Sequence, residues 1–411
     1  MKYIVLLGDG MADYPLGELN GKTPLEHARI PHMDEIASRG TIGLIDTVPP
    51  GFTPGSDVAN LSVLGYDPSV YHTGRAPLEA ASMGIPLDRN DVAFRCNFVT
   101  LGDEEDPIMV DFTAGHISSE EGRELIEELN ERLGSQDCSF YPGVGYRHLM
   151  VWRKGPAQMR TIPPHDIVGR TIGEQLPQGD GASEIRELMN SAREFLPRHR
   201  VNGQRAAGGK AQANAIWLWG EGSAPVIEPL TARYGITGGV ISAVDLLRGI
   251  GYYAGLESIP VEGATGYIDT NYEGKSEKAL EYLKTHDFIF LHVEAPDEMG
   301  HEGNIEGKIR AVEDFDKKIV GPILNEAGNL GDFRIAVLSD HPTPLSIKTH
   351  VADPSPIAVY SSNTSENLRN GSSFGETAAR QSGIVVSPGH RFMDLFIQRW
   401  SEFVEEKRNA G

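Results

Sequence analysis

The sequence predicts an α/β protein whose main sheet is rich in parallel strands. Three apolar, strand-like runs end in or lead to an acid: YIVLLGD (3–9), FIFLHVEAPD (288–297) and RIAVLSD (334–340). Helical patterns precede the second and third runs, SEKALEYLKT (276–285) and the amphipathic IEGKIRAVEDFDKKIVGPILNEA (305–327). Since a parallel α/β sheet presents its ligands at the carboxyl ends of its strands, the three acids are expected to share one crevice.

The N-terminal segment continues the same pattern. After the opening strand and a glycine-rich turn, a helix is expected over 31–39 and a short strand over 43–48. Glycine and proline in PPGFTPGSD (49–57) then predict a tight loop directly before a helical pattern. Ser56 and Asp57 are therefore expected at the N-terminus of a helix.

The middle of the chain predicts an inserted α+β domain. Its expected elements are strands over 93–101, 147–152 and 213–220 and helices over 118–133 and 241–250. A chain of 411 residues is expected to form two domains. Because the acids and histidines lie in the flanks, we expect a discontinuous catalytic domain (1–90 and 258–411). A substrate-binding cap (91–257) would interrupt it. Apolar residues over 395–404 are expected to form a core-facing helix stripe.

Composition narrows the classes of partner. The chain has 39% hydrophobic and 23% charged residues, typical of a soluble globular protein, and a formal net charge of −21. This charge argues against nucleic acid or an anionic membrane as a partner, because both require a basic face. No apolar stretch is long enough to span a bilayer, and no secretory signal is evident. Cys96 and Cys138 allow at most one disulfide, so a reducing cytoplasm is expected. The sequence leaves the choice between monomer and homo-oligomer open.

Acids and histidines near the two ends of the chain predict two metal sites. Asp297 and His301 are four residues apart, which lets a carboxylate and an imidazole converge on one ion, and His350 can supply a third ligand. The second site is predicted from Asp9, Asp340 and His341. Mixed Asp/His ligation suits Mn²⁺ or Zn²⁺ better than Ca²⁺, and two such ions can clamp both oxygens of an in-line phosphoryl displacement. Chance proximity explains a lone DxxxH spacing better, but not SDH directly after a buried strand.

Ser56 is the candidate nucleophile. A serine hydroxyl needs a base or a metal to become reactive, and a helix N-terminus helps to hold phosphate oxygens. The competing interpretation is that Ser56 is only a helix N-cap, and Thr53 competes for the nucleophile role. A nucleotide cofactor is not expected, because GQRAAGGKA (203–211) fails as a phosphate loop. Its lysine, Lys210, comes one residue too late, so a flexible loop is expected there.

Long motifs resemble those of the archaeal-type, cofactor-independent phosphoglycerate mutases of the alkaline phosphatase superfamily. The resemblance runs almost end to end and is carried by LLGDGMAD (6–13), KTPLEHARIPHMDEIASRG (22–40), TPGSDVANLSVLGYDP (53–68), TGRAPLEAA (73–81), GATGYIDTNYEGK (263–275), HVEAPDEMGHEG (292–303), LSDHPTP (338–344) and KTH (348–350). It implies an alkaline-phosphatase-like core with an inserted cap. It also implies interconversion of 2- and 3-phosphoglycerate, a small anionic substrate, through a phosphoserine.

The resemblance also implies residue roles. It implies two divalent ions, Mn²⁺ first, with Zn²⁺, Mg²⁺ or Co²⁺ as alternatives. One site would be Asp297, His301 and His350, and the other Asp9, Ser56, Asp340 and His341. Lys275 would neutralise charge near the phosphoserine, and Asp57 and Arg75 would line the site. Candidates in the cap for binding the glycerate, or for moving its protons, are Arg95, His116, Arg147, His148, His165, Asp166 and Lys210.

One segment departs from the family pattern. Where archaeal members tend to carry an arginine-rich D-R-x-A-G-R segment, this chain has DFTAGHI (111–117). Another phosphorylated small molecule therefore remains an alternative substrate, for a phosphomutase, a phosphatase or a homoserine-kinase-like enzyme. A rival of a different class is a catalytically weak metal-binding protein, although a decayed site is expected to lose ligands.

Overall fold

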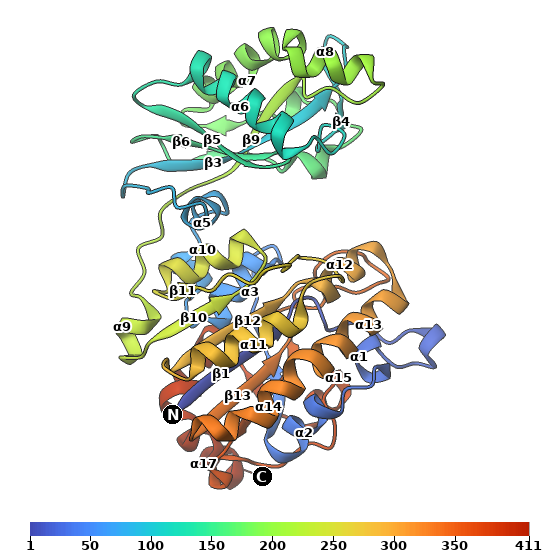
Figure 1. Cartoon of the computed structure of the whole chain (residues 1–411), viewed down its shortest axis with the longest axis vertical. Coiled ribbons are helices and arrows are strands. Elements are labelled where there is room, and N and C mark those ends of the chain that lie inside the picture. The colour runs from blue at the N-terminus through green and yellow to red at the C-terminus, as the bar shows by residue number, and fades with distance from the viewer. Residues whose placement is uncertain (411) are drawn as a thin grey trace. The chain divides into compact units, whose positions relative to one another are not determined.

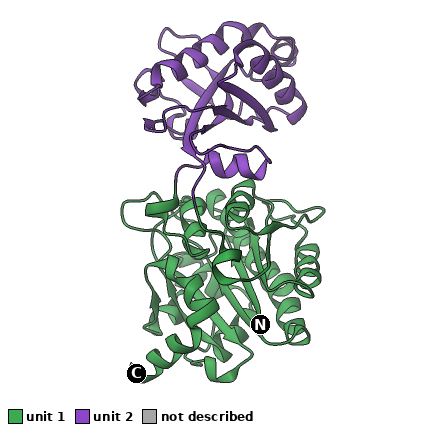
Figure 2. Ribbon diagram, turned by 90° about the vertical axis from the view of Figure 1, so that its left-hand side faces the viewer, with its two compact units in different colours: residues 1–72, 227–411 green, residues 73–226 purple. Residues whose placement is uncertain are grey.

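The computed structural model describes residues 1–410, and the chain forms two compact units (Figure 2). Unit 1 comprises residues 1–72 and 227–411, and unit 2 comprises residues 73–226. These limits differ from the division expected from the sequence. Helix α5 (Ala76–Ser82) packs on strands of unit 2, whereas β10 (Gly238–Ile241) pairs with a strand of unit 1. Pairing and packing partners, which the local sequence does not show, decide where each element belongs.

Unit 1 is built on an eight-stranded, mostly parallel sheet, which confirms the α/β expectation (Figure 1). In spatial order its strands are β11 (Glu257–Ser258), β10, β12 (Phe288–Val293), β1 (Lys2–Gly8), β13 (Phe333–Leu338), β14 (Ser355–Ser361), β2 (Thr41–Ile45) and β15 (Val385–Val386). Only β14 runs antiparallel to its neighbours. The short strand expected over 43–48 is β2, which begins and ends earlier.

Three strands at the centre of this sheet bring distant parts of the sequence together. Strand β1 pairs in parallel with β12 on one side and with β13 on the other. Its Leu7 lies opposite His292 of β12 and Leu338 of β13. The three carboxyl ends therefore lie side by side, and the chain leaves them through Asp9, Glu294 and Ser339.

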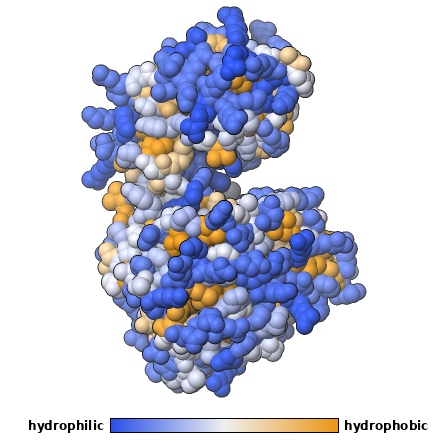
Figure 3. Space-filling model, in the orientation of Figure 1, coloured by the Kyte–Doolittle hydropathy of each residue, from blue (hydrophilic) through white to orange (hydrophobic). Residues whose placement is uncertain are grey.

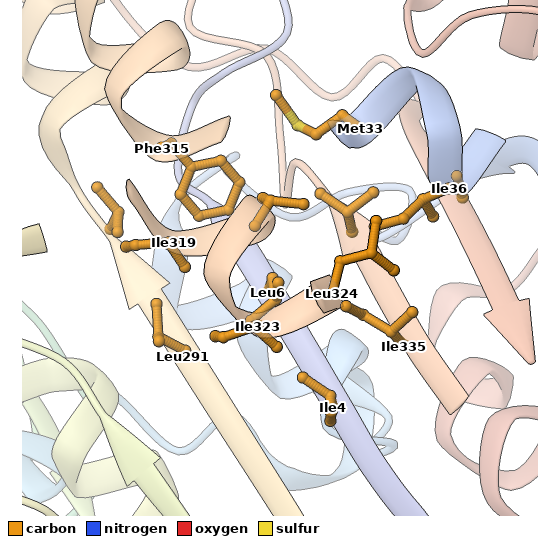
Figure 4. Close-up of a cluster of buried hydrophobic side chains, with 14 of the residues drawn as sticks. Ile4, Leu6, Met33, Ile36, Leu291, Phe315, Ile319, Ile323, Leu324 and Ile335 are labelled. Atoms are coloured by element: carbon orange, nitrogen blue, oxygen red, sulfur yellow. The ribbon is translucent and has the colours of Figure 1, made fainter. Parts of the chain in front are cut away.

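One face of the unit 1 sheet is covered by helices that enclose a hydrophobic core. These helices are α2 (Pro31–Arg39), α11 (Tyr272–Leu283), α13 (Ile305–Phe315) and α14 (Gly321–Ala327), with a π-helical turn over Asp316–Val320. Figure 4 shows Ile4, Leu6, Leu291 and Ile335 of the strands meeting Phe315 and its helical neighbours. The helix expected over 305–327 thus forms with one π-helical interruption.

The opposite face of the unit 1 sheet is covered by the C-terminal segment of the chain. Tyr3 of β1 packs edge-to-face on Phe396, with ring centroids 5.9 Å apart. Phe396 lies in a π-helical turn over Leu395–Arg399 that leads into α17 (Trp400–Ala410). Buried Phe403 and Val404 continue the stripe, which confirms the core-facing helix expected over 395–404. The remaining helices of unit 1 are α1 (Pro24–His27), α3 (Ser56–Val63), α4 (Pro68–Tyr71), α9 (Leu230–Tyr234), α10 (Asp245–Tyr253), α12 (Ala295–Glu302), α15 (Glu376–Gln381) and α16 (Phe392–Asp394).

Unit 2 is an α+β module with an antiparallel sheet. Its strands are β4 (Met109–Asp111), β3 (Val92–Leu101), β6 (Arg147–Trp152), β5 (Cys138–Val144) and β9 (Ala215–Ser223), which pairs with β3. Strands β7 (Met159–Arg160) and β8 (Gln178–Gly179) form a separate two-stranded antiparallel sheet. Figure 1 shows α6 (Ser119–Leu133), α7 (Ala182–Phe195) and α8 (Arg200–Ala207) on one side of this sheet. The loop expected over 203–211 is wrong for 203–207, which belong to α8.

The surface matches the polar composition. In Figure 3 the visible face of each unit is mostly hydrophilic, with hydrophobic residues scattered among polar ones. Among the described helices, none combines the length and apolar character required to cross a bilayer. Cys96 and Cys138 are both buried and free, so the disulfide that the sequence allowed is not formed.

Candidate active site

A first cluster joins Asp297, His301 and His350. Asp297 lies in the first turn of α12, beyond the end of β12, and not at the strand end where the sequence suggested. The Nε2 atoms of His301 and His350 lie 3.1 and 3.4 Å from its carboxylate oxygens and 2.9 Å from each other. Asp297 is buried, and both histidines are partly buried.

Backbone carbonyls fix the orientation of both imidazole rings. The Nδ1–H of His301 donates to Lys348 O at 3.0 Å, and that of His350 donates to Pro54 O at 3.3 Å. In the neutral rings, both Nε2 lone pairs then face the Asp297 carboxylate. Two lone pairs 2.9 Å apart repel each other unless a cation lies between them or one ring takes a second proton. The hydrogen bond to Asp297 raises the pKa of His301 to about 9, so His301 is the ring that takes this proton when no ion is bound. A histidine that donates its other N–H to a carbonyl is the usual arrangement of a metal ligand.

A second cluster joins the buried residues Asp9, Asp340 and His341. The Nε2 atom of His341 lies 3.5 Å from both Asp9 Oδ1 and Asp340 Oδ2. Asp340 is held by the backbone N–H groups of Gly10 and His341, at 3.1 and 2.9 Å. Asp9 Oδ1, in contrast, is buried without a hydrogen-bond partner. An orphaned buried carboxylate oxygen that faces further acids fits a cation site.

Ser56 reaches the second cluster. It is the first residue of α3, as expected, but the N-cap is Gly55 and no side chain caps the helix. The Ser56 hydroxyl instead lies 3.3 Å from His341 Nε2. Asn60, one turn further on, donates to both Ser56 O and Asp340 Oδ2 at 2.9 Å. The N-cap interpretation of Ser56 is therefore wrong, and the competing Thr53 is exposed.

The two clusters are neighbours. The rings of His341 and His350 lie 4.3 Å apart. Thr343 Oγ1 donates to Asp297 Oδ1 and lies 3.4 Å from His341 Nδ1. Because its one proton goes to the carboxylate, this oxygen accepts the Nδ1–H of His341. The Nε2 lone pair of His341 then faces Asp9, as the other two histidines face Asp297.

Crowded acids shift the ionisation of the crevice. Burial, together with the charges of Asp340 and Glu294, raises the pKa of Asp9 well above its usual range. Burial also raises the pKa of Glu294 to about 8, and Asp297 adds to this. Burial opposes ionisation of Asp297, but without an ion the imidazoles of His301 and His350, when protonated, donate to its carboxylate and hold its pKa well below the usual range. Bound cations would neutralise these neighbouring carboxylates and stabilise their ionised forms.

Two residues of β12 and its exit were missed by the sequence analysis. His292 and Glu294 form a third group with Asp9, with His292 Nε2 2.8 Å from Asp9 Oδ2 and 3.4 Å from Glu294 Oε2. Lys275 lies at the same place, with its Nζ 3.4 Å from His292 O. Burial lowers the pKa of Lys275 to about 8, although the charge of Glu294 opposes this.

A buried lysine beneath the clusters was also missed. Lys308 Nζ lies 2.7 Å from Asp13 Oδ2 and donates to Ala12 O and Thr343 O. Lys308 and Asp13 have no exposed side-chain surface. This ion pair joins the loop after β1 to the loop after β13, which together carry Asp9 and Asp340. A lysine in an amphipathic helix gives no sequence signal of such a role.

Asp57 is the remaining candidate of unit 1. Its carboxylate accepts from Val58 N at 3.0 Å and lies 3.0 Å from His72 Nε2. His72 in turn packs edge-on against Phe52. Asp57 is thus held beside Ser56 by its own helix and by a histidine that the sequence did not single out.

In unit 2, part of the expected set forms a cationic group. Arg95 is buried, lies 4.3 Å above the Trp219 ring, and its Nε lies 3.0 Å from Glu79. Burial lowers the pKa of Arg95 to about 10, opposed by Glu79 and assisted by Arg75 and Arg147. Burial likewise lowers the pKa of His165, which packs against Trp219. Arg75, Arg95, Arg147 and His165 are therefore close enough to sense one another electrostatically.

The other expected residues of unit 2 lie elsewhere. Successive residues of a strand point to opposite faces, so His148 faces away from Arg147 and packs against Phe98. His148 is buried, and burial lowers its pKa to about 3. His116 and Lys210 are exposed on two loops that Arg205 and Glu121 connect. Asp166 is exposed, 3.8 Å from His165 Nε2.

The fold and the paired clusters define a class: an α/β protein with adjacent carboxylate–imidazole groups suited to divalent ions. A family profile described as 2,3-bisphosphoglycerate-independent phosphoglycerate mutase matches residues 37–202. The chain is 56% identical to a probable member from Geobacter sulfurreducens and 54% identical to a member from Methanosarcina barkeri. Each alignment covers 97% of this chain and all of the relative. The chain belongs to the family of 2,3-bisphosphoglycerate-independent phosphoglycerate mutases.

Solved structures agree with this assignment. A protein from Pyrococcus horikoshii superposes with a TM-score of 0.82 at 29% identity and covers 97% of both chains. The cofactor-independent phosphoglycerate mutase from Thermoplasma acidophilum superposes with a TM-score of 0.66 at 26% identity, covering 97% of this chain and 99% of its own.

Proposed function

We propose that the protein interconverts 2- and 3-phosphoglycerate by transferring the phosphoryl group to Ser56 and back. Family membership supports the reaction. The observation that carries the residue assignment is the shared direction of three imidazole lone pairs. His301, His341 and His350 each donate Nδ1–H to an oxygen and turn Nε2 toward a carboxylate.

The proposed ligands form two sites. Asp297, His301 and His350 would hold one divalent ion, and Asp9, Asp340, His341 and Ser56 the other. We assign Mn²⁺ to both, since mixed carboxylate and imidazole ligands suit it. When bound, two such ions supply Lewis acidity to the attacking and leaving oxygens.

Side chains of the protein orient the serine and the ligands and offset charge. In the absence of an ion, the Ser56 hydroxyl donates to His341 Nε2, which orients its oxygen toward the crevice. The Asn60 amide holds the Ser56 carbonyl and the Asp340 carboxylate in register. Lys275, charged when protonated, offsets negative charge that accumulates on the transferring group. In unit 2, we assign the carboxylate of the substrate to Arg95 and Arg147.

An assay without added 2,3-bisphosphoglycerate tests this function. Protein reconstituted with Mn²⁺ is incubated with 3-phosphoglycerate while 2-phosphoglycerate and free phosphate are measured. The proposal expects 2-phosphoglycerate without stoichiometric phosphate. Phosphate alone would indicate a phosphatase, and no product would refute this substrate.

The serine assignment has its own test. Ser56→Ala is expected to abolish turnover and labelling of the protein by ³²P-phosphoglycerate, because no hydroxyl remains to accept the phosphoryl group. Ser69→Ala, which removes an exposed hydroxyl of the same unit, is the matched control and should retain both. Undiminished turnover in Ser56→Ala would eliminate Ser56 as the nucleophile.

A further inference from the structure

The third group of candidate ligands differs from the other two in the direction of its histidine. His292 is fully buried in β12, with Nε2 2.8 Å from Asp9 Oδ2 and Nδ1 3.1 Å from Ser242 Oγ. Ser242 Oγ accepts the N–H of Val244 at 3.0 Å. Its own proton is then free to be donated to His292 Nδ1.

This arrangement sets the tautomer of His292. With Nδ1 accepting from Ser242, the proton of the neutral ring lies on Nε2 and is donated to Asp9 Oδ2. When Asp9 is ionised, as a metal ligand must be, the opposite tautomer would place the Nε2 lone pair 2.8 Å from a carboxylate oxygen, which is repulsive. In the neutral form that binds an ion, His301, His341 and His350 carry their protons on Nδ1, so His292 alone of these four rings then presents a donor to its carboxylate.

A cation is already present in the third group. Lys275 is buried beside it, and its ammonium acts electrostatically on both Glu294 and His292. An additional divalent ion at Asp9, His292 and Glu294 would be repelled by this charge, because Lys275 Nζ lies 3.4 Å from His292 O. Lysine therefore takes the place of an ion there, which leaves His292 free to act as a hydrogen-bond donor.

We propose that Ser242 and His292 form a relay that positions Asp9 as a ligand of the second cluster. The Nε2–H holds Asp9 Oδ2, and this leaves Oδ1, the buried oxygen without a partner, directed toward Asp340 and His341. The inference requires one part of the proposed function, namely that the second cluster binds a divalent ion. His292 and Ser242 contact neither ion nor substrate, so they are positioning residues.

The test is Mn²⁺ binding to metal-depleted protein without substrate, measured by electron paramagnetic resonance of free Mn²⁺. His292→Leu is expected to weaken binding at the second cluster by roughly 10- to 100-fold, the usual effect of losing the partner that orients a ligand. Binding at Asp297, His301 and His350 stays unchanged. His292→Gln, whose amide can still reach Asp9, recovers part of the affinity.

Two further variants separate positioning from folding. Ser242→Ala shows a smaller loss at the same cluster, and Ser276→Ala, which alters another buried serine of unit 1, shows none. In ¹⁵N-histidine spectra, the resonances lost in His292→Gln should be those of an Nε2–H tautomer, and Ser242→Ala should shift them. Unchanged affinity in both His292 variants would overturn the relay. The relay would also be refuted if the protein bound three ions and His292→Leu bound only two. An Nδ1–H tautomer of His292 would refute it as well.

The outcomes distinguish this inference from the proposed function. A protein that binds Mn²⁺ as described but converts another substrate leaves the relay intact and refutes the mutase assignment. Normal mutase activity with Mn²⁺ affinity insensitive to His292 refutes the relay alone.

Discussion

Replacing Lys308 with methionine tests whether the buried ion pair beneath the clusters holds the two ligand loops together. The substitution roughly conserves volume but leaves the Asp13 carboxylate without its cation 2.7 Å away. It also removes donors from Ala12 O and Thr343 O. Removing one partner of a buried pair costs about 3–5 kcal/mol, because an uncompensated charge remains in the interior. We expect a loss of that size in the free energy of unfolding of unit 1.

The reporter for this measurement is Trp400, because the other three tryptophans belong to unit 2. Incorporated 5-fluorotryptophan, with the Trp400 resonance assigned by Trp400→Phe, reports urea unfolding of unit 1 separately. Asp13→Asn in the Lys308→Met background removes the stranded charge. The double variant should therefore lose at least about 1 kcal/mol less than the sum of the single variants. A loss under about 1 kcal/mol for Lys308→Met, or strict additivity, would refute the reasoning.

Two further predictions concern protons and metals. Burial raises the pKa of Glu376 to about 7, although Thr23 and Asp13 N oppose the shift. The folded state then holds more protons than the unfolded state between about pH 4.5 and 7, so stability falls as pH rises through this window. The difference approaches about 3 kcal/mol, and Glu376→Gln should flatten it in urea titrations at each pH. Chelation of divalent ions should abolish turnover and lower the unfolding midpoint of Trp400, because the carboxylates of the crevice then repel. Midpoints unaffected by Mn²⁺ would contradict this.

The sequence was sufficient to predict the residues whose position follows from strand ends. Asp9 and Asp340 each follow an uninterrupted apolar run, and parallel strands present such residues at one edge. Ser56 was predicted because glycine and proline force a loop before its helix. Asp297 was predicted in the right crevice but on the wrong element. It lies in α12, because Pro296 favours the first turn of a helix.

Residues that act through burial could not be predicted in the same way. His292 lies inside an apolar run and resembles a core position, and only the sheet register places it beside β1. Lys308 has the spacing of a solvated lysine in an amphipathic helix, and its burial depends on two loops that are distant in sequence. His148 is different, since the alternation of a strand already separates it from Arg147. Because side chains alternate between the two faces of a strand, the sequence RHLMVW could have excluded His148 from the group of residues expected to bind the substrate anion.

The sheet order explains why one crevice draws on both ends of the chain. Strand β1 is central, and the two strands that flank it, β12 and β13, come from beyond unit 2 in sequence. His292 therefore lies on one side of Asp9, in β12, and Asp340 lies on the other side, directly after β13. An insertion between α4 and α9 leaves these two strand pairings untouched, because none of their hydrogen bonds involves residues 73–226. Unit 2 can therefore diverge, as DFTAGHI does, without altering the geometry of the clusters. Exchanging 111–117 for an arginine-rich segment should accordingly change substrate KM while leaving Mn²⁺ affinity unchanged, and a change in that affinity would contradict the independence of the two units.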